Sequence, residues 1–229
     1  ELAEPLCVRL TEIYERVLGT DNPEVATSYN NLALLYAAQK KFGPAETLYT
    51  RSLELKTNLY GDKHPEVGDL LQNLGTLYFN QERYQEAEPL LKQSLEILET
   101  ALGEGHSDLE ILLVNLAQVL EKNGKYLDSS KIYEKILSIK EIQLGPTHPE
   151  IIQMLKLVSQ SYARRAKYDE AERFLKRAVT IWERAQGKNS PQGADLFSAL
   201  GALNQEQKKV TQAENYYRDA LAAAQTALY

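Results

Sequence analysis

Three histidines are the residues of this 229-residue sequence best suited to ligate a metal ion or to transfer protons. His64, His106 and His148 recur at intervals of 42 residues. Stacked helical layers would separate such positions by roughly 10 Å, whereas the ligands of one metal ion lie about 2 Å from it. We therefore expect the histidines to cap or pack helices, and we expect no metal site.

No other pattern indicates catalysis or cofactor binding. The sequence contains no GxGxxG, GxxxxGK[ST], HExxH or GxSxG motif. Cys7 is the only cysteine, which excludes a disulfide within the chain and suits a reducing cytoplasm. In the full-length protein we expect Cys7 to be an inert core thiol, and we expect Trp182 to serve packing. The sequence thus predicts no catalytic residues, no cofactor and no enzyme.

The composition is that of a soluble folded protein, with 43% apolar and 25% charged residues. No run approaches the roughly 18 apolar residues of a membrane span. The net charge of −6 argues against nucleic-acid binding. Charge is uneven: residues 1–120 carry 9 Lys+Arg and 19 Asp+Glu, and residues 121–229 carry 17 and 13. The chain starts at Glu1 without a methionine or signal-peptide pattern, so we expect a fragment of a longer protein.

Four series of residues recur with a period of 42, which makes an internal repeat the main signal for the fold. One repeat position holds proline, with serine once: Pro23, Pro65, Ser107, Pro149 and Pro191. A second holds glycine: Gly19, Gly61, Gly103, Gly145 and Gly187. A third holds an aromatic residue until the last repeat: Phe42, Tyr84, Tyr126, Tyr168 and Val210. A fourth holds a small residue: Ala3, Ala45, Ala87, Ser129, Ala171 and Ala213.

Each repeat predicts two antiparallel helices joined by a short polar turn. In the first full repeat, apolar residues at helical spacing predict helices over 24–38 and 44–59. Proline suits the first turn of a helix, and glycine ends one because it adopts left-handed geometry. The sequence predicts an all-α superhelix of about eleven helices: one from a truncated repeat at 1–18, then full repeats from about 23, 65, 107, 149 and 191. Because half a repeat cannot bury its apolar face alone, we expect one domain over 1–229.

Residues at the predicted helix crossings resemble the tetratricopeptide repeat. The large–small pairs of that family match Leu32-Ala33, Leu74-Gly75, Leu116-Ala117 and Leu200-Gly201, and its aromatic position matches Tyr36, Tyr78 and Tyr162. The period of 42 exceeds the usual 34 by eight residues. This longer form, seen in segments 29–36 and 59–67, closely resembles the repeats of kinesin light chains and of a wider set of eukaryotic and bacterial proteins. The resemblance covers essentially the whole sequence.

The resemblance implies that the first helix of each repeat lines a peptide-binding groove. Mapped onto this sequence, the groove residues are Asn30, Asn31, Gln72, Asn73, Asn115, Gln118, Lys122, Lys156, Gln160 and Arg164. Side-chain amides both donate to and accept from the backbone of an extended peptide. The cations among these residues would attract an acidic segment. As an alternative, Asn31, Asn73 and Asn115 hydrogen-bond between neighbouring repeats and only hold the stack together.

The sequence therefore predicts a cytoplasmic scaffold or adaptor that binds an extended, partly acidic peptide of a client protein. For a kinesin light chain-like protein, the resemblance implies cargo recognition for motor transport. The alternative is a regulatory or sensor segment of a larger multidomain protein, bacterial proteins included, that acts on a neighbouring domain of its own chain.

Overall fold

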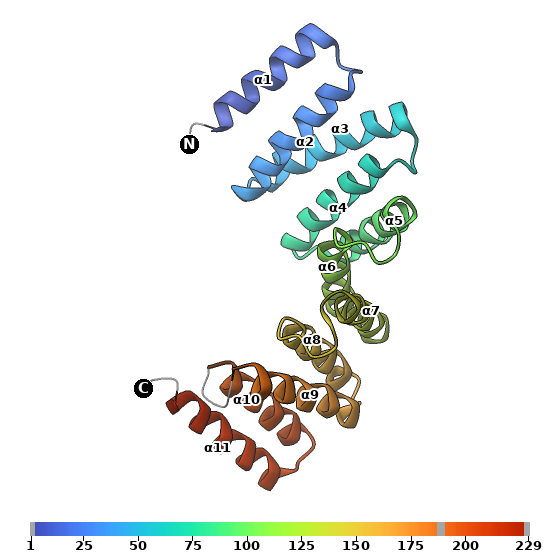
Figure 1. The fold of residues 1–229 in the computed structure, drawn as a ribbon. Helices are drawn as coiled ribbons and strands as arrows, with labels where there is room; N and C mark the ends of the chain where they lie inside the picture. Colours follow the sequence, from blue (N-terminus) through green and yellow to red (C-terminus); the bar gives the residue numbers. More distant parts are fainter. Residues whose placement is uncertain (1–2, 187–190, 227–229) are drawn as a thin grey trace. The chain divides into compact units, whose positions relative to one another are not determined.

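The computed structural model describes residues 3–186 and 191–226, and these ranges contain eleven α-helices and no strand. The helices, shown in Figure 1, are α1 (Ala3–Leu18), α2 (Pro23–Ala38), α3 (Phe42–Tyr60), α4 (Pro65–Asn80), α5 (Tyr84–Leu102), α6 (Leu109–Lys122), α7 (Tyr126–Leu144), α8 (Ile151–Arg164), α9 (Tyr168–Gln186), α10 (Pro191–Glu206) and α11 (Val210–Thr226). We call α2, α4, α6, α8 and α10 the A helices, because each is the first helix of a repeat, and the others the B helices. The predicted all-α repeat architecture is confirmed.

The helix boundaries follow the sequence closely, with one difference. The helices predicted over 24–38 and 44–59 are α2 and α3. The two A helices α6 and α8 begin two residues after positions 107 and 149. At both sites the first turn is tight: the amide of Glu110 donates to the carbonyl of Ser107, and that of Ile152 to the carbonyl of Pro149, each at 3.1 Å. In both bonds the donor lies three residues after the acceptor, as in a 3₁₀ turn, which is tighter than the α-helix.

The three histidines accept hydrogen bonds in the turns before the A helices, and His64 is the N-cap residue of α4. The imidazole Nδ1 atoms of His64, His106 and His148 each accept a hydrogen bond of 3.3 Å from the backbone amide two residues later. In the first repeat Asn22 fills the same role, since its Oδ1 accepts from the amide of Glu24 at 2.9 Å. The bonds of Asn22 and His64 satisfy amides in the first turns of α2 and α4, whereas those of His106 and His148 reach the residues just before α6 and α8. The predicted capping role is confirmed for His64, whereas His106 and His148 precede the N-cap residues Asp108 and Glu150 because α6 and α8 begin two residues later.

Glycine ends the B helices as predicted. Gly19, Gly61, Gly103 and Gly145 have φ values of 82°, 86°, 93° and 95°. Residues other than glycine rarely adopt a positive φ, which explains why glycine recurs at this position in every repeat. Gly187 lies outside the described residues.

A second left-handed residue occurs where each A helix turns into its B helix, and sequence reasoning missed it. In four repeats this residue has a side chain and a φ value between 55° and 61°: Lys40, Glu82, Ala166 and Lys208. In the third repeat it is Gly124. The backbone bonds of the turn hold this conformation; for example, the amide of Lys41 donates to the carbonyl of Tyr36 at 2.8 Å.

The contacts divide the chain into two compact units, unit 1 (Glu1–Asn123) and unit 2 (Gly124–Tyr229). Each is described by itself, and the single domain expected over 1–229 stays a prediction. The core of unit 1 includes Ala33, Ala45, Tyr49, Leu74 and Leu77. That of unit 2 includes Ala171, Leu175, Leu200 and Leu203. In both cores, small residues of one helix of a repeat pack against large residues of the other helix.

Small residues are required where A and B helices cross. A Cβ atom on Gly75 would lie 2.7 Å from a methyl carbon of Leu91, and one on Gly201 would lie 2.7 Å from the ring of Tyr217. Trp182 is 1% exposed and meets the ring of Phe197 edge-on, with 5.9 Å between the ring centroids. The packing role expected of Trp182 is confirmed.

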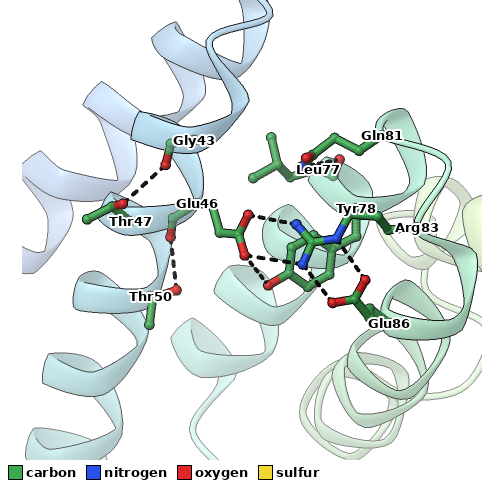
Figure 2. A network of polar contacts seen from close by, with 9 residues as sticks. All are labelled: Gly43, Glu46, Thr47, Thr50, Leu77, Tyr78, Gln81, Arg83 and Glu86. Atoms are coloured by element: carbon green, nitrogen blue, oxygen red, sulfur yellow. Dashed lines mark hydrogen bonds and ion pairs between the residues drawn. The ribbon is translucent and has the colours of Figure 1, made fainter.

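A polar network joins the first two repeats of unit 1 (Figure 2). The carboxylate of Glu46 in α3 accepts a hydrogen bond of 2.8 Å from the Tyr78 hydroxyl in α4. It also accepts one of 2.7 Å from the guanidinium of Arg83, which lies 4.0 Å from the centre of the Tyr78 ring. Arg83 completes the network with two bonds, 2.6 and 2.7 Å long, to Glu86 in α5. The network holds α3, α4 and α5 in register.

Two further findings concern the described helices and the cysteine. None of the helices within residues 3–186 and 191–226 has the length and apolar character that crossing a membrane requires. Cys7, in α1, is half-buried and forms no disulfide.

Candidate peptide-binding surface

The ten residues predicted to line a groove all lie on A helices, and none of them is buried. Asn31, Lys122, Gln160 and Arg164 are exposed; Asn30, Gln72, Asn73, Asn115, Gln118 and Lys156 are half-buried. The first seven in chain order belong to α2, α4 and α6 of unit 1, and the last three to α8 of unit 2. Each unit thus presents its own set of polar groups on its A helices.

The amides of unit 1 partly serve to join repeats. The Asn73 amide donates to Oδ1 of Asn30 at 3.0 Å, and the Asn115 amide donates to the hydroxyl of Thr76 at 3.2 Å. Both bonds connect one A helix to the preceding one, as the alternative interpretation of the asparagine row expects. Each bond uses one of several hydrogen-bonding positions on an amide, so the side-chain oxygens of Asn73 and Asn115 keep capacity for a ligand.

The three predicted cations differ in how they are engaged. Lys156 in α8 forms an ion pair with Asp195 in α10. Lys122 lies over the ring of Tyr84, and Arg164 over the ring of Tyr126, at 5.8 and 5.9 Å from the ring centres. Within the described residues, no carboxylate forms an ion pair with Lys122 or Arg164. These two cations are therefore better placed than Lys156 to attract an acidic ligand.

A polar hollow of about 110 Å³ lies between α2, α3 and α4 in unit 1. Its lining residues are Thr27, Asn30, Ser52, Lys56, Glu66, Asp69, Leu70 and Asn73. Only Asn30 and Asn73 were predicted; the remaining residues were missed. The signal available in the sequence was Lys56, a lysine within α3 at a repeat position that holds Leu98, Lys140 and Trp182 in the next three repeats.

Lys56 is the buried cation of this hollow. It is 5% exposed, and its ammonium lies 2.5 Å from the carboxylate of Glu66 and 5.3 Å from the centre of the Tyr60 ring. A buried ammonium needs a partner of opposite charge, and Glu66 supplies it. Lys56 is thus committed to Glu66.

Asp69 is the carboxylate at the rim of the same hollow. Its partial removal from water raises its pKa above the usual 3.8, and the carboxylates of Glu66 and Asp108 raise it further. No lysine, arginine or histidine among the described residues forms an ion pair with Asp69. The ionised form of Asp69 is therefore less stable here than in water.

Unit 2 has a hollow of a different character, with a volume of about 150 Å³, between α8, α9 and α10. Its walls are largely apolar and small: Ala163, Leu175, Ala199, Ala202 and Leu203. Lys156, Ser159, Gln160 and Glu206 complete the lining.

The chain's own repeats explain why the apolar hollow exists. Three repeats earlier, the positions of Leu175, Ala199 and Ala202 are occupied by larger residues, namely Tyr49, Asn73 and Thr76. Tyr49 is 2% exposed and belongs to the core of unit 1. The smaller residues of unit 2 leave space that unit 1 fills.

Family models place the chain among tetratricopeptide repeats, with matches over residues 1–58, 45–100, 108–181 and 154–226. Among curated proteins, none matches the chain.

Solved structures show the same fold. One is a Podosopora anserina protein given as a candidate kinesin light chain with nearly identical TPR-like repeats, with 20% identity, a TM-score of 0.76, and coverage of 89% of this chain and 96% of that one. Another is BtubC (BKLC) from P. vanneervenii, with 19% identity, a TM-score of 0.71, and coverage of 96% and 89%. A third is YrrB, described as a TPR protein with an unusual peptide-binding site, with 18% identity, a TM-score of 0.64, and coverage of 95% of both chains. The predicted similarity to kinesin light chain-like repeats is confirmed for the fold.

Proposed function

Because this chain belongs to the tetratricopeptide repeat family, whose members serve as protein–protein interaction scaffolds, we propose that its A helices bind an extended peptide of a partner protein. One observation carries the proposal: in each unit, accessible amide side chains of the A helices lie beside a hollow. Amides bond to the backbone of a peptide, and hollows accept its side chains. The peptide-binding site named for YrrB, a protein of the same fold, supports this proposal.

The apolar hollow of unit 2 accepts one aliphatic or aromatic side chain of the peptide. Its apolar lining matches that chemistry, and in unit 1 the ring of Tyr49 occupies the corresponding part of the repeat. An apolar anchor in a well-defined pocket commonly supplies much of the binding energy of a peptide.

Ala202→Leu tests this role. Ala202 is exposed, so the larger side chain fills the hollow from its rim without disturbing the core. Random twelve-residue peptides displayed on phage would be selected against the whole chain, and the affinities of selected peptides would be measured by fluorescence anisotropy. We expect Ala202→Leu to weaken binding about tenfold.

The matched control is Ala224→Leu, which makes the same change at an exposed position of the B helix α11 and should leave affinity unchanged. Equal affinities for wild type and Ala202→Leu would contradict the role of this hollow. Failure of the whole chain to select any peptide would contradict peptide binding itself.

Arg164 attracts the acidic part of the peptide. Its guanidinium is exposed on α8 and has no carboxylate partner among the described residues. Replacing Lys156 would be a less direct test, because it would also leave Asp195 without its cation.

We therefore expect Arg164→Glu to lower the affinity for selected peptides that contain Asp or Glu about fivefold or more, and to reduce the salt dependence of binding. Peptides without acidic residues should bind the variant and the wild type equally. A uniform loss for both peptide classes would show a structural role of Arg164 instead.

The more specific form of the role is recruitment of cargo to a microtubule motor in the cytoplasm. It rests on the similarity to candidate kinesin light chain repeats and on a single cysteine that forms no disulfide.

A further inference from the structure

We propose that the polar hollow of unit 1 binds a basic side chain, lysine or arginine, of the partner peptide through the carboxylate of Asp69. The inference rests on the proposed peptide-binding function and adds to it the chemistry of one side chain of the ligand.

The geometry of the hollow leaves Asp69 as its available charge. The buried ammonium of Lys56 is bound to Glu66, and the amide of Asn73 is bound to Asn30. Asp69 shares the lining of the hollow with these four residues but forms an ion pair with none of them. A cation entering the hollow from solvent would therefore meet a carboxylate that has not been neutralised.

Unit 2 contains the same arrangement with the cation already in place. Three repeats after Asn30 and Asp69, the corresponding residues are Lys156 and Asp195, and these two form an ion pair between neighbouring A helices. The carboxylate at this repeat position is thus within reach of an ammonium group on the side of the preceding A helix. In unit 1 that place is occupied by Asn30, whose side chain bonds to Asn73 instead. The ammonium of Lys156 shows where a ligand's ammonium would lie relative to Asp69.

The electrostatic surroundings of Asp69 also favour a cation. Partial removal from water is the main cause that raises the pKa of Asp69, and the carboxylates of Glu66 and Asp108 add to it by disfavouring the ionised form. The sequence through residue 120 carries 19 acidic and 9 basic side chains. A cationic side chain would relieve repulsion that the free protein retains, whereas an acidic side chain would add to it.

The experiment uses the whole chain and defined peptide mixtures. Random decapeptides with one fixed position, which is Lys, Arg, Gln or Glu, would be captured on immobilised wild-type protein and quantified by mass spectrometry. We expect enrichment of the Lys and Arg mixtures over the Gln mixture of about tenfold at one peptide position.

Two variants remove this preference in opposite ways. Asp69→Asn removes the carboxylate. Asn30→Lys supplies an internal cation that copies the Lys156–Asp195 pair in place of the Asn30–Asn73 bond, and it should keep the midpoint of thermal unfolding close to that of wild type while it abolishes the preference. A variant that unfolds at the wild-type temperature and loses the preference excludes misfolding as the cause. The control is Asp62→Asn, which removes an equal charge from an exposed position before α4 and should keep the preference.

The outcomes separate this inference from the function on which it rests. If peptides bind but show no preference for Lys or Arg, or if Asn30→Lys keeps the preference, the basic-side-chain site is wrong and peptide binding stands. If no mixture is retained by the wild-type protein, peptide binding itself fails, and this inference with it.

Discussion

At the scale of single residues, the partner available to a charged group differs between repeats that share one sequence pattern. Asp195 has the ammonium of Lys156, whereas Asp69 at the same repeat position has none among the described residues. The difference arises from one substitution in the preceding A helix, where Asn30 stands at the position of Lys156. A change of one side chain converts an internal ion pair into an unneutralised carboxylate beside a hollow.

Asp69 should lower the stability of the free protein at neutral pH. Its folded-state pKa lies above 3.8, so the native chain holds this proton to higher pH than the unfolded chain. The resulting loss in the free energy of unfolding is absent below about pH 3.8, and it is complete once the pH exceeds the raised pKa. We expect Asp69→Asn to raise the midpoint of thermal unfolding only slightly at pH 7, because solvent screens the exposed carboxylate, and to have no effect near pH 3. Thermal unfolding followed by circular dichroism between pH 3 and pH 8 would measure the difference in midpoint between the variant and the wild type. A variant less stable than wild type at pH 7 contradicts the prediction.

At the scale of helices, the connections are specified by local geometry. A left-handed glycine ends each described B helix up to α7, and a second left-handed residue begins the turn after each A helix. Only Gly124 is a glycine at the second position; the other four repeats place a side chain there. Since residues other than glycine are strained in this conformation, the repeats tolerate a local cost to keep the turn.

Gly124→Ala should therefore lower the free energy of unfolding by about 1 kcal/mol. No atom lies within 4 Å of the added methyl group, so the effect would come from the backbone alone. Urea unfolding followed by circular dichroism measures the change. Gly43→Ala is the matched control: Gly43 lies in α3 with equal space around it and no positive φ, so alanine should stabilise by about 0.5–1 kcal/mol. Equal effects at both positions would contradict this explanation.

At the scale of the whole molecule, the sequence predicts one cooperative array, and the coordinates describe two compact units. In repeat proteins each repeat gains stability from its neighbours, so a defect in one repeat spreads along the array. The predicted single domain thus has a measurable consequence.

Leu74→Ala in unit 1 tests it. Leu74 is 5% exposed within the core cluster, and its truncation should cost about 2–5 kcal/mol. If the chain is one cooperative array, amide hydrogen exchange should accelerate in α8–α11 as well as in α2–α5. Acceleration confined to unit 1 would show that the two units unfold independently, and would overturn the single-domain prediction. Mass spectrometry of proteolytic fragments gives the required resolution.

The sequence by itself determined the repeat, its helices and most of their ends. These features depend on rules that act within a few residues: the fixed φ of Pro23 and Pro65, the left-handed glycines, and the apolar spacing of each helix. It also predicted the cap that His64 makes, because capping is local, but not the later starts of α6 and α8. The residue types of the candidate surface followed from the family pattern, although whether that surface binds peptide stays a prediction.

Only the tertiary structure decided which of these side chains are already engaged. The Asn73–Asn30 bond and the Lys156–Asp195 pair join residues 43 and 39 positions apart, on neighbouring A helices. Such partners depend on distances between helices that no local rule gives. The two hollows depend on the volume left after all neighbouring side chains have packed. A 42-residue repeat fixes where a side chain stands along the chain, but the space and the partner it meets are properties of the packed helices.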